Sequence, residues 1–544
     1  MKGYFKRTTF FIGLVVCLAG CGVSGTVTNE TEPEELSVTL NEEWQEDQSE
    51  KEKEYQELLK SGDYNEDNIY VKVDPYDASP LSALLLFQTE EAMKVEISVV
   101  GKDDESTIKN SFEEYTTDHS IPVLGLYADT DNEVTVKLTN EAGTRVEKKV
   151  TIKTGALAKS IAEIEVNEAD TEKMALGDSE LTFVVPSTKR AYAFDANGDV
   201  RWYSTRYNSH IFKELANGNL LYLTKESNDA DTYNVLLETD YLGKIYNRYD
   251  FSSSSASNDT GKSEGEMTVI HHDGIELPSG NLLLTVNDGS NYIEDTMIEL
   301  NRETGEIEKT IDLKDILPES FYEEYDSTSR EDGKIDWFHQ NSVEYDEADN
   351  SIIISGRHQD TIMKIDYATN EIKWIMGDSS SWPESYQKYF LDGDIKASGG
   401  QHAAIVLPDQ DDNAETTDIL YYDNNISVTR GDEADSEKYS EARQVRINEE
   451  DRTIEEVWNF GEDLGEAYFT KIIGSARYLT DNGNRLVNFG YREEGKTSSI
   501  MEVTEDGETV LDVDLTDFPT SAWAYRAERF SLYNDNWTYQ LNED

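Results

Sequence analysis

The sequence predicts an all-β protein in which a six-bladed β-propeller follows an N-terminal β-sandwich domain of Ig-like type. Three observations lead to this fold class. Short stretches of alternating polar and apolar residues fill residues 68–156, six hairpin-like units recur in the remainder, and helical periodicity is scarce. With 37% hydrophobic residues among 544, the chain can also bury a substantial core.

Residues 1–20 have the organisation of a secretory signal peptide. Three basic residues precede an apolar run over residues 10–19, which is too short to span a bilayer stably. The run ends in Leu-Ala-Gly-Cys, which resembles the bacterial lipobox, so signal cleavage is expected to leave Cys21 as the lipid-bearing N-terminus. The alternative is an ordinary signal peptide followed by a chance cysteine. We therefore expect an extracytoplasmic protein tethered to the cell membrane.

The cysteine content offers no internal disulfide. Of the two cysteines, Cys17 would leave with the signal peptide and Cys21 would carry the lipid. No later segment is long and apolar enough for a transmembrane helix. Packing and hydrogen bonds are therefore expected to stabilise the exported fold.

Acidic residues dominate the charge of the chain. The 112 acidic residues outnumber 48 basic ones and give a formal charge of −64, which argues against nucleic acid or an anionic lipid surface as a partner. An anion-binding site in such a chain must gather local positive charge, so its few His and Arg residues are informative. Residues 21–67 are especially polar and acidic, which predicts a linker, helical in part, without a core of its own.

The β-sandwich is predicted over residues 68–156. Its strands are indicated by IYVKVDPYD, MKVEISVV, NEVTVKLTN and VEKKVTIKT, which are separated by Asp, Asn and Gly turns.

The propeller is predicted over residues 157–544 from two alternating sequence elements. One is a hairpin around a turn with Gly, Asn or Asp, as in AYAFDANGDVRWY and MIELNRETGEIEKTI, and it occurs six times. A blade cannot bury both faces alone, so the ring must close. The terminal AWAYRAERFSLY resembles a copy of the other element, while LTFVVPSTKRAYAF supplies strands without a preceding partner. The two ends of this region are therefore expected to share one blade.

Four histidines occupy one register of the other element. His210, His272, His339 and His402 follow one another at 62, 67 and 63 residues, although the chain has only seven histidines. Equal registers of a propeller lie at equal height and radius, so these side chains are expected to converge on the central axis. Retention of a histidine for packing is the alternative.

Arg357, in SIIISGRHQDT, follows His339 within the same predicted blade. Three histidines can bind zinc, but such a site prefers supporting carboxylates and disfavours a fixed cation nearby. Histidine with arginine instead suits an oxyanion, because guanidinium gives forked charge-assisted hydrogen bonds and imidazole can donate or attack. We therefore predict no metal and no cofactor.

Several long motifs resemble one bacterial enzyme family. DWFHQNSVEYDEADNSIIISGRHQDTIMKIDYATNEIKWIMG, GGQHAAIVLPDQDD, IHHDGIELPSGNLLL, YRAERFSLY and DPYDASPLSALLLF are similar to the PAPS-independent arylsulfate sulfotransferases, with a resemblance that extends over residues 68–540. Members of that family are six-bladed propellers with an N-terminal β-sandwich, in agreement with the fold expected from the repeats.

The resemblance implies transfer of a sulfuryl group from a phenolic sulfate ester to a phenol acceptor by a ping-pong mechanism. By this resemblance His402 is the nucleophile that becomes a transient sulfohistidine. His272, His339 and Arg357 match the sulfate-holding positions, and Asn341 is a further substrate-binding candidate. A neutral imidazole at His402 would split one difficult transfer into two displacements.

Other residues near these motifs are weaker candidates. His271 adjoins His272, and the shared register favours the latter. No family role is assigned to His210, for which a structural role is expected. Tyr76 and Tyr525 are aromatic candidates for the site, whereas His358 and His119 are interpreted as ordinary surface or hydrogen-bonded histidines.

Two departures from the family concern location. Some members are soluble periplasmic proteins with a disulfide near the active site, and this chain has neither feature available. The lipid anchor and missing disulfide suggest a Gram-positive cell surface. The oligomeric state stays open, with a homodimer as one alternative.

Two alternative functions also stay open. One is an arylsulfatase-like hydrolase in which water discharges His402. The other is a non-catalytic propeller that binds sulfated ligands.

Overall fold

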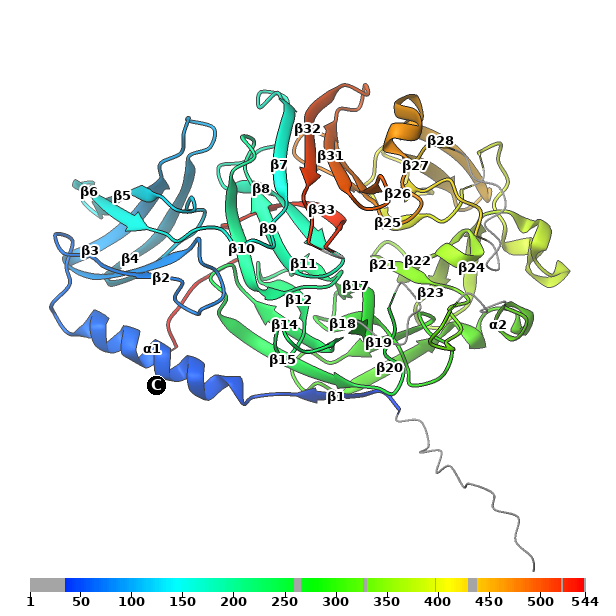
Figure 1. Cartoon of the computed structure of the whole chain (residues 1–544), viewed down its shortest axis with the longest axis horizontal. Helices are drawn as coiled ribbons and strands as arrows, with labels where there is room; N and C mark the ends of the chain where they lie inside the picture. Colours follow the sequence, from blue (N-terminus) through cyan, green and yellow to red (C-terminus); the bar gives the residue numbers. More distant parts are fainter. Residues whose placement is uncertain are drawn as a thin grey trace, which may run out of the picture. The chain divides into compact units, whose positions relative to one another are not determined.

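The computed structural model describes residues 35–258, 266–325, 330–396, 398–428, 438–519 and 522–542. The predicted signal peptide and Cys21 lie outside these residues. β-strands are the main secondary structure of the described chain, as Figure 1 shows, which confirms the all-β class. Over the same residues, none of the helices combines the length and apolar character needed to cross a membrane.

The first sheet is formed by five strands that follow one another along the chain. Its order is β2-β3-β5-β6, and β4 pairs with the other edge of β3. The strands are β2 (Tyr70–Val73), β3 (Ala83–Val99), β4 (Ile108–Val123), β5 (Asp131–Asn140) and β6 (Arg145–Lys153). Alternate residues such as Val95, Ile97 and Val99 are buried, as expected for strands with one face in a core.

The segment interpreted as an acidic linker contains ordered elements. Strand β1 (Ser37–Leu40) pairs with β15 (Ile245–Ser252), and helix α1 (Trp44–Lys60) contacts β3 and β4. The buried face of α1 is formed by residues at helical spacing, namely Gln48, Glu52, Tyr55 and Leu59. The composition of this segment did not indicate this packing, because two of the four buried residues are polar.

Six further antiparallel sheets follow within the described residues, each with four or five strands. The first contains β8 (Glu180–Pro186), β9 (Arg190–Phe194), β10 (Val200–Tyr207) and β33 (Ala524–Ser531). The second contains β11 (Phe212–Glu214), β12 (Leu220–Thr224), β14 (Val235–Thr239), β15 and β1. The third contains β17 (Ile270–Glu276), β18 (Leu282–Val286), β19 (Thr296–Leu300) and β20 (Ile307–Asp312).

The remaining three sheets repeat the same up-and-down order. The fourth contains β21 (Gln340–Asp346), β22 (Ser351–Gly356), β23 (Thr361–Asp366) and β24 (Ile372–Met376). The fifth contains β25 (His402–Val406), β26 (Thr416–Asp423), β27 (Glu441–Asn448) and β28 (Thr453–Phe460). The sixth contains β29 (Ser475–Tyr478), β30 (Arg485–Arg492), β31 (Thr497–Val503), β32 (Thr509–Thr516) and β7 (Glu163–Ala169).

Short elements connect these sheets. Strands β13 (Thr232–Tyr233) and β16 (Met267–Thr268) form a parallel pair, and the connecting helices include α2 (Glu319–Glu323), η1 (Leu313–Asp315), η2 (Arg357–Gln359), η3 (Ser379–Ser381), η4 (Glu384–Tyr389) and η6 (Glu462–Tyr468).

One strand of each sheet contacts a strand of the next. β17 contacts β21, β21 contacts β25, β25 contacts β29, and β29 contacts β33 (Figure 1). Phe212 of β11 stacks near Phe530 of β33, with ring centroids 6.1 Å apart. Strand β33, the last of the chain, pairs with β8, as the sequence predicted for its two ends. These contacts bring the beginnings of β11, β17, β21 and β25 close together.

A buried arginine joins the first sheet to the rest of the described chain. Arg201 of β10 donates to the backbone oxygens of Gly125 and Ser106 at 2.9 and 2.8 Å. It also forms an ion pair with Asp195 at 2.8 Å and lies over the ring of Tyr127. Because these partners lie on both sides of the junction, one side chain holds the two regions together.

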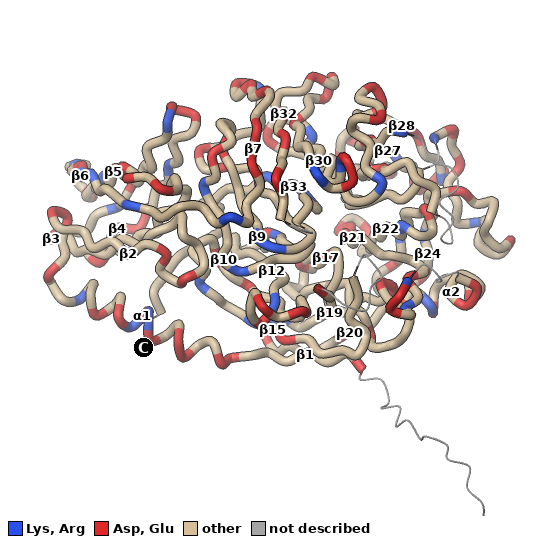
Figure 2. The backbone as a smooth tube through the Cα atoms, viewed as in Figure 1, with Lys and Arg blue, Asp and Glu red and all other residues tan. Residues whose placement is uncertain are grey.

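Charged residues are distributed over many elements. Figure 2 shows Asp and Glu along helix α1 and at several hairpin turns, with fewer Lys and Arg between them. This distribution accords with the formal charge of −64.

Candidate active site

A recurring backbone bend positions the histidines. His210, His272 and His339 have φ angles of 56, 42 and 54°, in the left-handed region that non-glycine residues seldom occupy. Each lies at or beside the beginning of the inner strand of its sheet. At His402 the bend falls one residue later, where Ala403 has a φ of 56°. Strained backbone of this kind is retained where the surroundings determine it, and it collects at functional sites.

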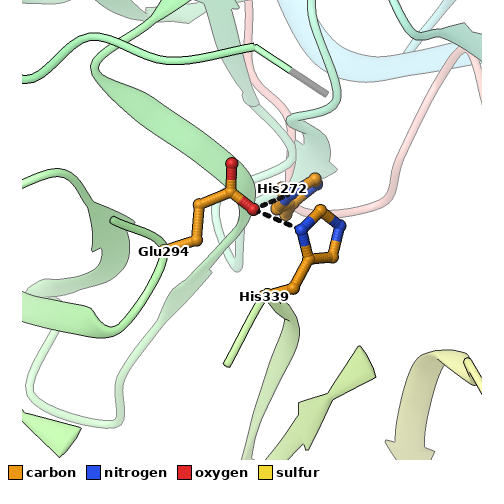
Figure 3. A group of neighbouring side chains, drawn as sticks. All are labelled: His272, Glu294 and His339. Atoms are coloured by element: carbon orange, nitrogen blue, oxygen red, sulfur yellow. Dashed lines mark hydrogen bonds and ion pairs between the residues drawn. The ribbon is translucent and has the colours of Figure 1, made fainter. Parts of the chain in front are cut away.

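Glu294 connects two of the predicted site histidines. Its Oε2 lies 3.0 Å from Nε2 of His272 and 2.7 Å from Nδ1 of His339 (Figure 3). Because a carboxylate only accepts, both ring nitrogens donate to it. Nδ1 of His272 lies 3.0 Å from the Tyr525 hydroxyl, so both nitrogens of this ring are engaged.

Asp336 is a second carboxylate at the same ring. Its Oδ2 lies 2.8 Å from Nδ1 of His339. Arg330 forms an ion pair with Asp336 at 3.4 Å and a closer one with Asp332 at 2.8 Å. The ring of His358 stacks on that of His339, with centroids 4.6 Å apart. The carboxylates therefore surround one edge of His339, and a second imidazole covers its face.

The two carboxylates give His339 a different protonation behaviour from its neighbours. Burial opposes a positive charge on His339, but Asp336 and Glu294 outweigh it and raise its pKa to about 10. Burial likewise opposes the charge on Glu294, but His339 and His272 hold the pKa of this carboxyl well below its usual range. Burial lowers the pKa values of His271 and His358 to about 3.

His402 is held in one tautomer by Asn424. The Asn424 amide nitrogen donates to the backbone oxygens of Thr470 and Ile473, at 2.7 and 3.1 Å, which fixes the orientation of the amide. Its oxygen therefore faces Nδ1 of His402 at 2.7 Å and accepts the hydrogen there. Burial lowers the pKa of His402 well below its usual value, and the charges of Arg357 and His339 lower it further. The result is a neutral imidazole with a lone pair on Nε2.

Arg357 lies beside these histidines at the start of η2. Its backbone nitrogen donates to the oxygen of His339 at 3.2 Å, and Nη1 lies 2.7 Å from Nε2 of His358. The guanidinium is 7% exposed and close enough to lower the pKa of His402. The structure thus brings Arg357, His272, His339 and His402 together.

Asn341, predicted as a substrate-binding residue, lies against the backbone of Gln401, next to His402. Its amide nitrogen donates to the backbone oxygen of Gln401 at 2.7 Å. Its own backbone oxygen accepts from Arg526 at 2.9 Å. Asn341 therefore supports the residue that precedes His402.

The weaker candidates separate into two groups. His210 lies near His272 and Tyr525, with ring centroids 5.0 and 4.2 Å apart, so it belongs to the cluster. His271 contacts the ring of His272 from the side. Two candidates instead contact residues of the N-terminal region: Tyr76 bonds to Glu52, and His119 bonds to Thr89.

Two groups of side chains present donor atoms at a spacing that a metal ion would require. They are His272, Glu294 and His339, and also Asp336, His339 and His358, with the atoms of each group within 4.8 Å of one another. The carboxylates already accept hydrogen bonds from the rings, and the Arg357 and Arg330 cations disfavour another positive charge. We therefore assign no metal to either group.

Comparison with known families shows to which family the chain belongs. The family model of arylsulfotransferase (ASST) matches residues 163–526, and that of the arylsulfotransferase Ig-like domain matches residues 70–155. The chain belongs to the arylsulfotransferase family. This relationship confirms the Ig-like N-terminal domain.

Two relatives extend the match to most of the chain. Arylsulfate sulfotransferase AssT from Escherichia coli O6:H1 (strain CFT073) is 23% identical over 561 residues. The enzyme of the same name from Lelliottia amnigena is 23% identical over 570 residues. Each alignment covers 84% of this chain and 92% of the relative. The arylsulfotransferase described here is therefore an aryl-sulfate sulfotransferase, with an aryl sulfate donor and a phenol acceptor.

The site of this arylsulfotransferase contains residues that the sequence did not suggest. Glu294, Asp336 and Asn424 come from connections between strands, and His358, predicted to be a surface or hydrogen-bonded histidine, is hydrogen-bonded within the cluster. The one available signal was the spacing of Asp336, three residues before His339.

Proposed function

We propose that this sulfotransferase works by a ping-pong mechanism in which His402 carries the sulfuryl group as a sulfohistidine. The observation that supports this role is the contact of Nδ1 of His402 with Oδ1 of Asn424 at 2.7 Å. Because Nδ1 holds the hydrogen, Nε2 keeps its lone pair. A buried, neutral imidazole in this tautomer is a competent nucleophile.

The first half-reaction is a displacement at sulfur. A bond forms between Nε2 of His402 and the sulfur of the donor, while the bond from sulfur to the aryl oxygen breaks and its electron pair leaves with that oxygen. In the second half-reaction the acceptor phenol attacks sulfur and releases His402. His402 keeps its Nδ1 hydrogen, donated to Asn424, throughout, so the ring needs no tautomer change.

Arg357, His339 and His272 are proposed to hold the oxygens of the sulfate group, with the single Nε2–H of His339 directed at the oxygen that bridges sulfur and the aryl ring. A hydrogen bond to a charged group is worth about 1.5–3 kcal/mol, and donors fixed by sheets need little reorganisation. Both nitrogens of His272 are bonded to Glu294 and Tyr525. A direct bond from His272 to a sulfonate therefore requires the exchange of one of these partners.

The six sheets are proposed to be the blades of one closed six-bladed propeller. Strand contacts run in series from β17 to β33, and β33 pairs with β8 of the first sheet. This arrangement accounts for the meeting of histidines that lie far apart in the sequence.

The mature enzyme is proposed to be anchored to a Gram-positive cell surface through lipidated Cys21. Membrane fractionation of cells that make the wild type or Cys21→Ser tests this location. We expect the wild type with the membranes and the variant in a released or unprocessed form. A freely released, unlipidated wild type would overturn the anchor.

Mass spectrometry after mixing with donor alone tests the proposed chemistry. We expect a sulfuryl adduct on His402 with 4-nitrophenyl sulfate, which disappears when phenol is added, and no adduct or transfer with His402→Ala. Full transfer by that variant would contradict the assignment. Donor cleavage that does not depend on phenol indicates the hydrolase, and absence of cleavage indicates a binding protein.

A further inference from the structure

We infer that Glu294 and Asp336 are positioning residues that keep His339 in the protonated form, so that its Nε2–H gives a proton to the departing aryl oxygen. This assignment rests on the proposed transfer through His402 and adds the group that handles the proton. It also explains why an enzyme that binds anionic donors retains two buried carboxylates beside its sulfate-holding residues.

The geometry of His339 supports this protonation state. Nδ1 meets two carboxylate oxygens, at 2.7 Å from Glu294 and 2.8 Å from Asp336, while the other ring nitrogen points away from Glu294 (Figure 3). The Glu294 and Asp336 side chains are each at most 2% exposed. Buried carboxylates require a compensating charge, and a neutral imidazole supplies none.

The other charged and titratable groups around His339 do not supply the positive charge that Glu294 and Asp336 need, so we assign this charge to His339. Arg330 forms an ion pair with Asp336 at 3.4 Å and a closer one with Asp332 at 2.8 Å. Burial keeps the pKa values of His271, His358 and His402 low. The remaining groups that face this cluster are His272, bonded to Glu294, and Arg357, bonded to His358.

The proton balance of the transfer is then complete. As the bond from sulfur to oxygen breaks, the aryl oxygen takes the proton of Nε2 of His339, and phenol leaves with His339 neutral. The acceptor phenol returns a proton to the same nitrogen when it attacks the sulfohistidine. The His339 pKa of about 10 resembles that of a phenol, about 10 for tyrosine, so the proton moves between groups of similar basicity in both directions.

Glu294→Gln and Asp336→Asn test this role. Each removes one carboxylate charge, so His339 is expected to lose its proton at lower pH. We expect the alkaline limit of sulfo-enzyme formation to fall by about one pH unit or more in each variant. The rate loss should be greater with phenyl sulfate than with 4-nitrophenyl sulfate, because the poorer leaving group depends more on the acid.

Glu238→Gln is the matched control. Glu238 is a buried carboxylate that pairs with Arg302 and bonds to Asn219, so its loss also removes a buried charge but leaves the histidines unchanged. We expect a lower melting temperature and an unchanged pH profile. An equal loss at every pH and with both donors in Glu294→Gln and Asp336→Asn would overturn the inference.

Asp336→Glu covers the case in which the amide variants fail to fold. It retains the charge, so we expect a lower maximum rate with the alkaline limit of the wild type, whereas a fallen limit would contradict the inference. Failure of the proposed function itself is distinguishable, because the wild type would then show no sulfuryl adduct on His402 with donor alone.

Discussion

Nδ1 of His402 donates to Oδ1 of Asn424 over 2.7 Å, and the backbone oxygens of Thr470 and Ile473 hold the asparagine in place. The imidazole proposed as the nucleophile is thus oriented by a neutral amide. An amide fixes the ring and raises the pKa of His402 less than a carboxylate would, so burial and the nearby positive charges still keep this pKa low.

Replacement of Asn424 is therefore expected to change the acidic limit of the enzyme. Asn424→Asp places a charge at Nδ1, raises the pKa of His402 and moves the acidic limit of sulfo-enzyme formation to higher pH. Asn424→Ala should lower the rate without this movement, because the tautomer is no longer fixed. Stopped-flow measurement of phenol release against pH checks both results. An unchanged acidic limit in Asn424→Asp would show that His402 does not titrate in this step.

Arg357→Lys tests whether the planar guanidinium of Arg357, with its forked donors, is needed to bind the sulfonate. Lysine keeps the charge but loses the forked donors, so we expect transfer to fall by about 10- to 100-fold, equivalent to the loss of one charge-assisted hydrogen bond. Steady-state kinetics with varied donor measures the change. Arg302→Lys, at a guanidinium that pairs with Glu238, is the control and should keep wild-type turnover.

Arg201 should contribute strongly to stability. Arg201→Ala leaves the buried Asp195 carboxylate without its ion pair, which costs about 3–5 kcal/mol in the free energy of unfolding. Urea denaturation measures this change. Lys102→Ala removes an exposed pair with Asp199 and should cost less than about 1 kcal/mol. Similar losses in the two variants would argue against the importance of Arg201.

His119 should make the N-terminal region sensitive to acid. Burial lowers its pKa from 6.5 to about 4, so below pH 6.5 the unfolded chain binds a proton that the folded chain does not. Stability is therefore lost as the pH falls from 6.5 towards 4. Between pH 7 and 5 this histidine should cost about 2 kcal/mol, and His119→Gln should remove that part of the decline. Urea denaturation at both pH values checks the difference, and a parallel decline in both proteins would contradict it.

The repeated parts of the fold were predictable because their signals recur. Hairpins with Gly, Asn or Asp turns marked the sheets, and their order implied the pairing of β33 with β8. The common register of His272, His339 and His402 likewise predicted that they meet. Because the same position recurs in several sheets, one physical explanation applies to all of them and can be checked at each.

The two carboxylates of the site could not be predicted in the same way. Glu294 and Asp336 lie in connections without a shared register, among 112 acidic residues that are mostly unrelated to the site. These two carboxylates differ from most acidic residues of the chain because they are buried, and burial depends on tertiary packing that the sequence does not reveal. The same reason applies to helix α1, where buried Glu52 pairs with Lys244 although the composition suggested a solvated segment.

Strand β33 is the last strand of the described chain, yet it carries Tyr525 to the ring of His272 and completes the sheet begun by β8. Assembly of the histidine cluster must therefore wait until residues 524–531 have been synthesised. A chain that stopped before Ala524 would lack this strand and the Tyr525 hydroxyl beside His272, so it would emerge as an inert polypeptide instead of a partly working enzyme.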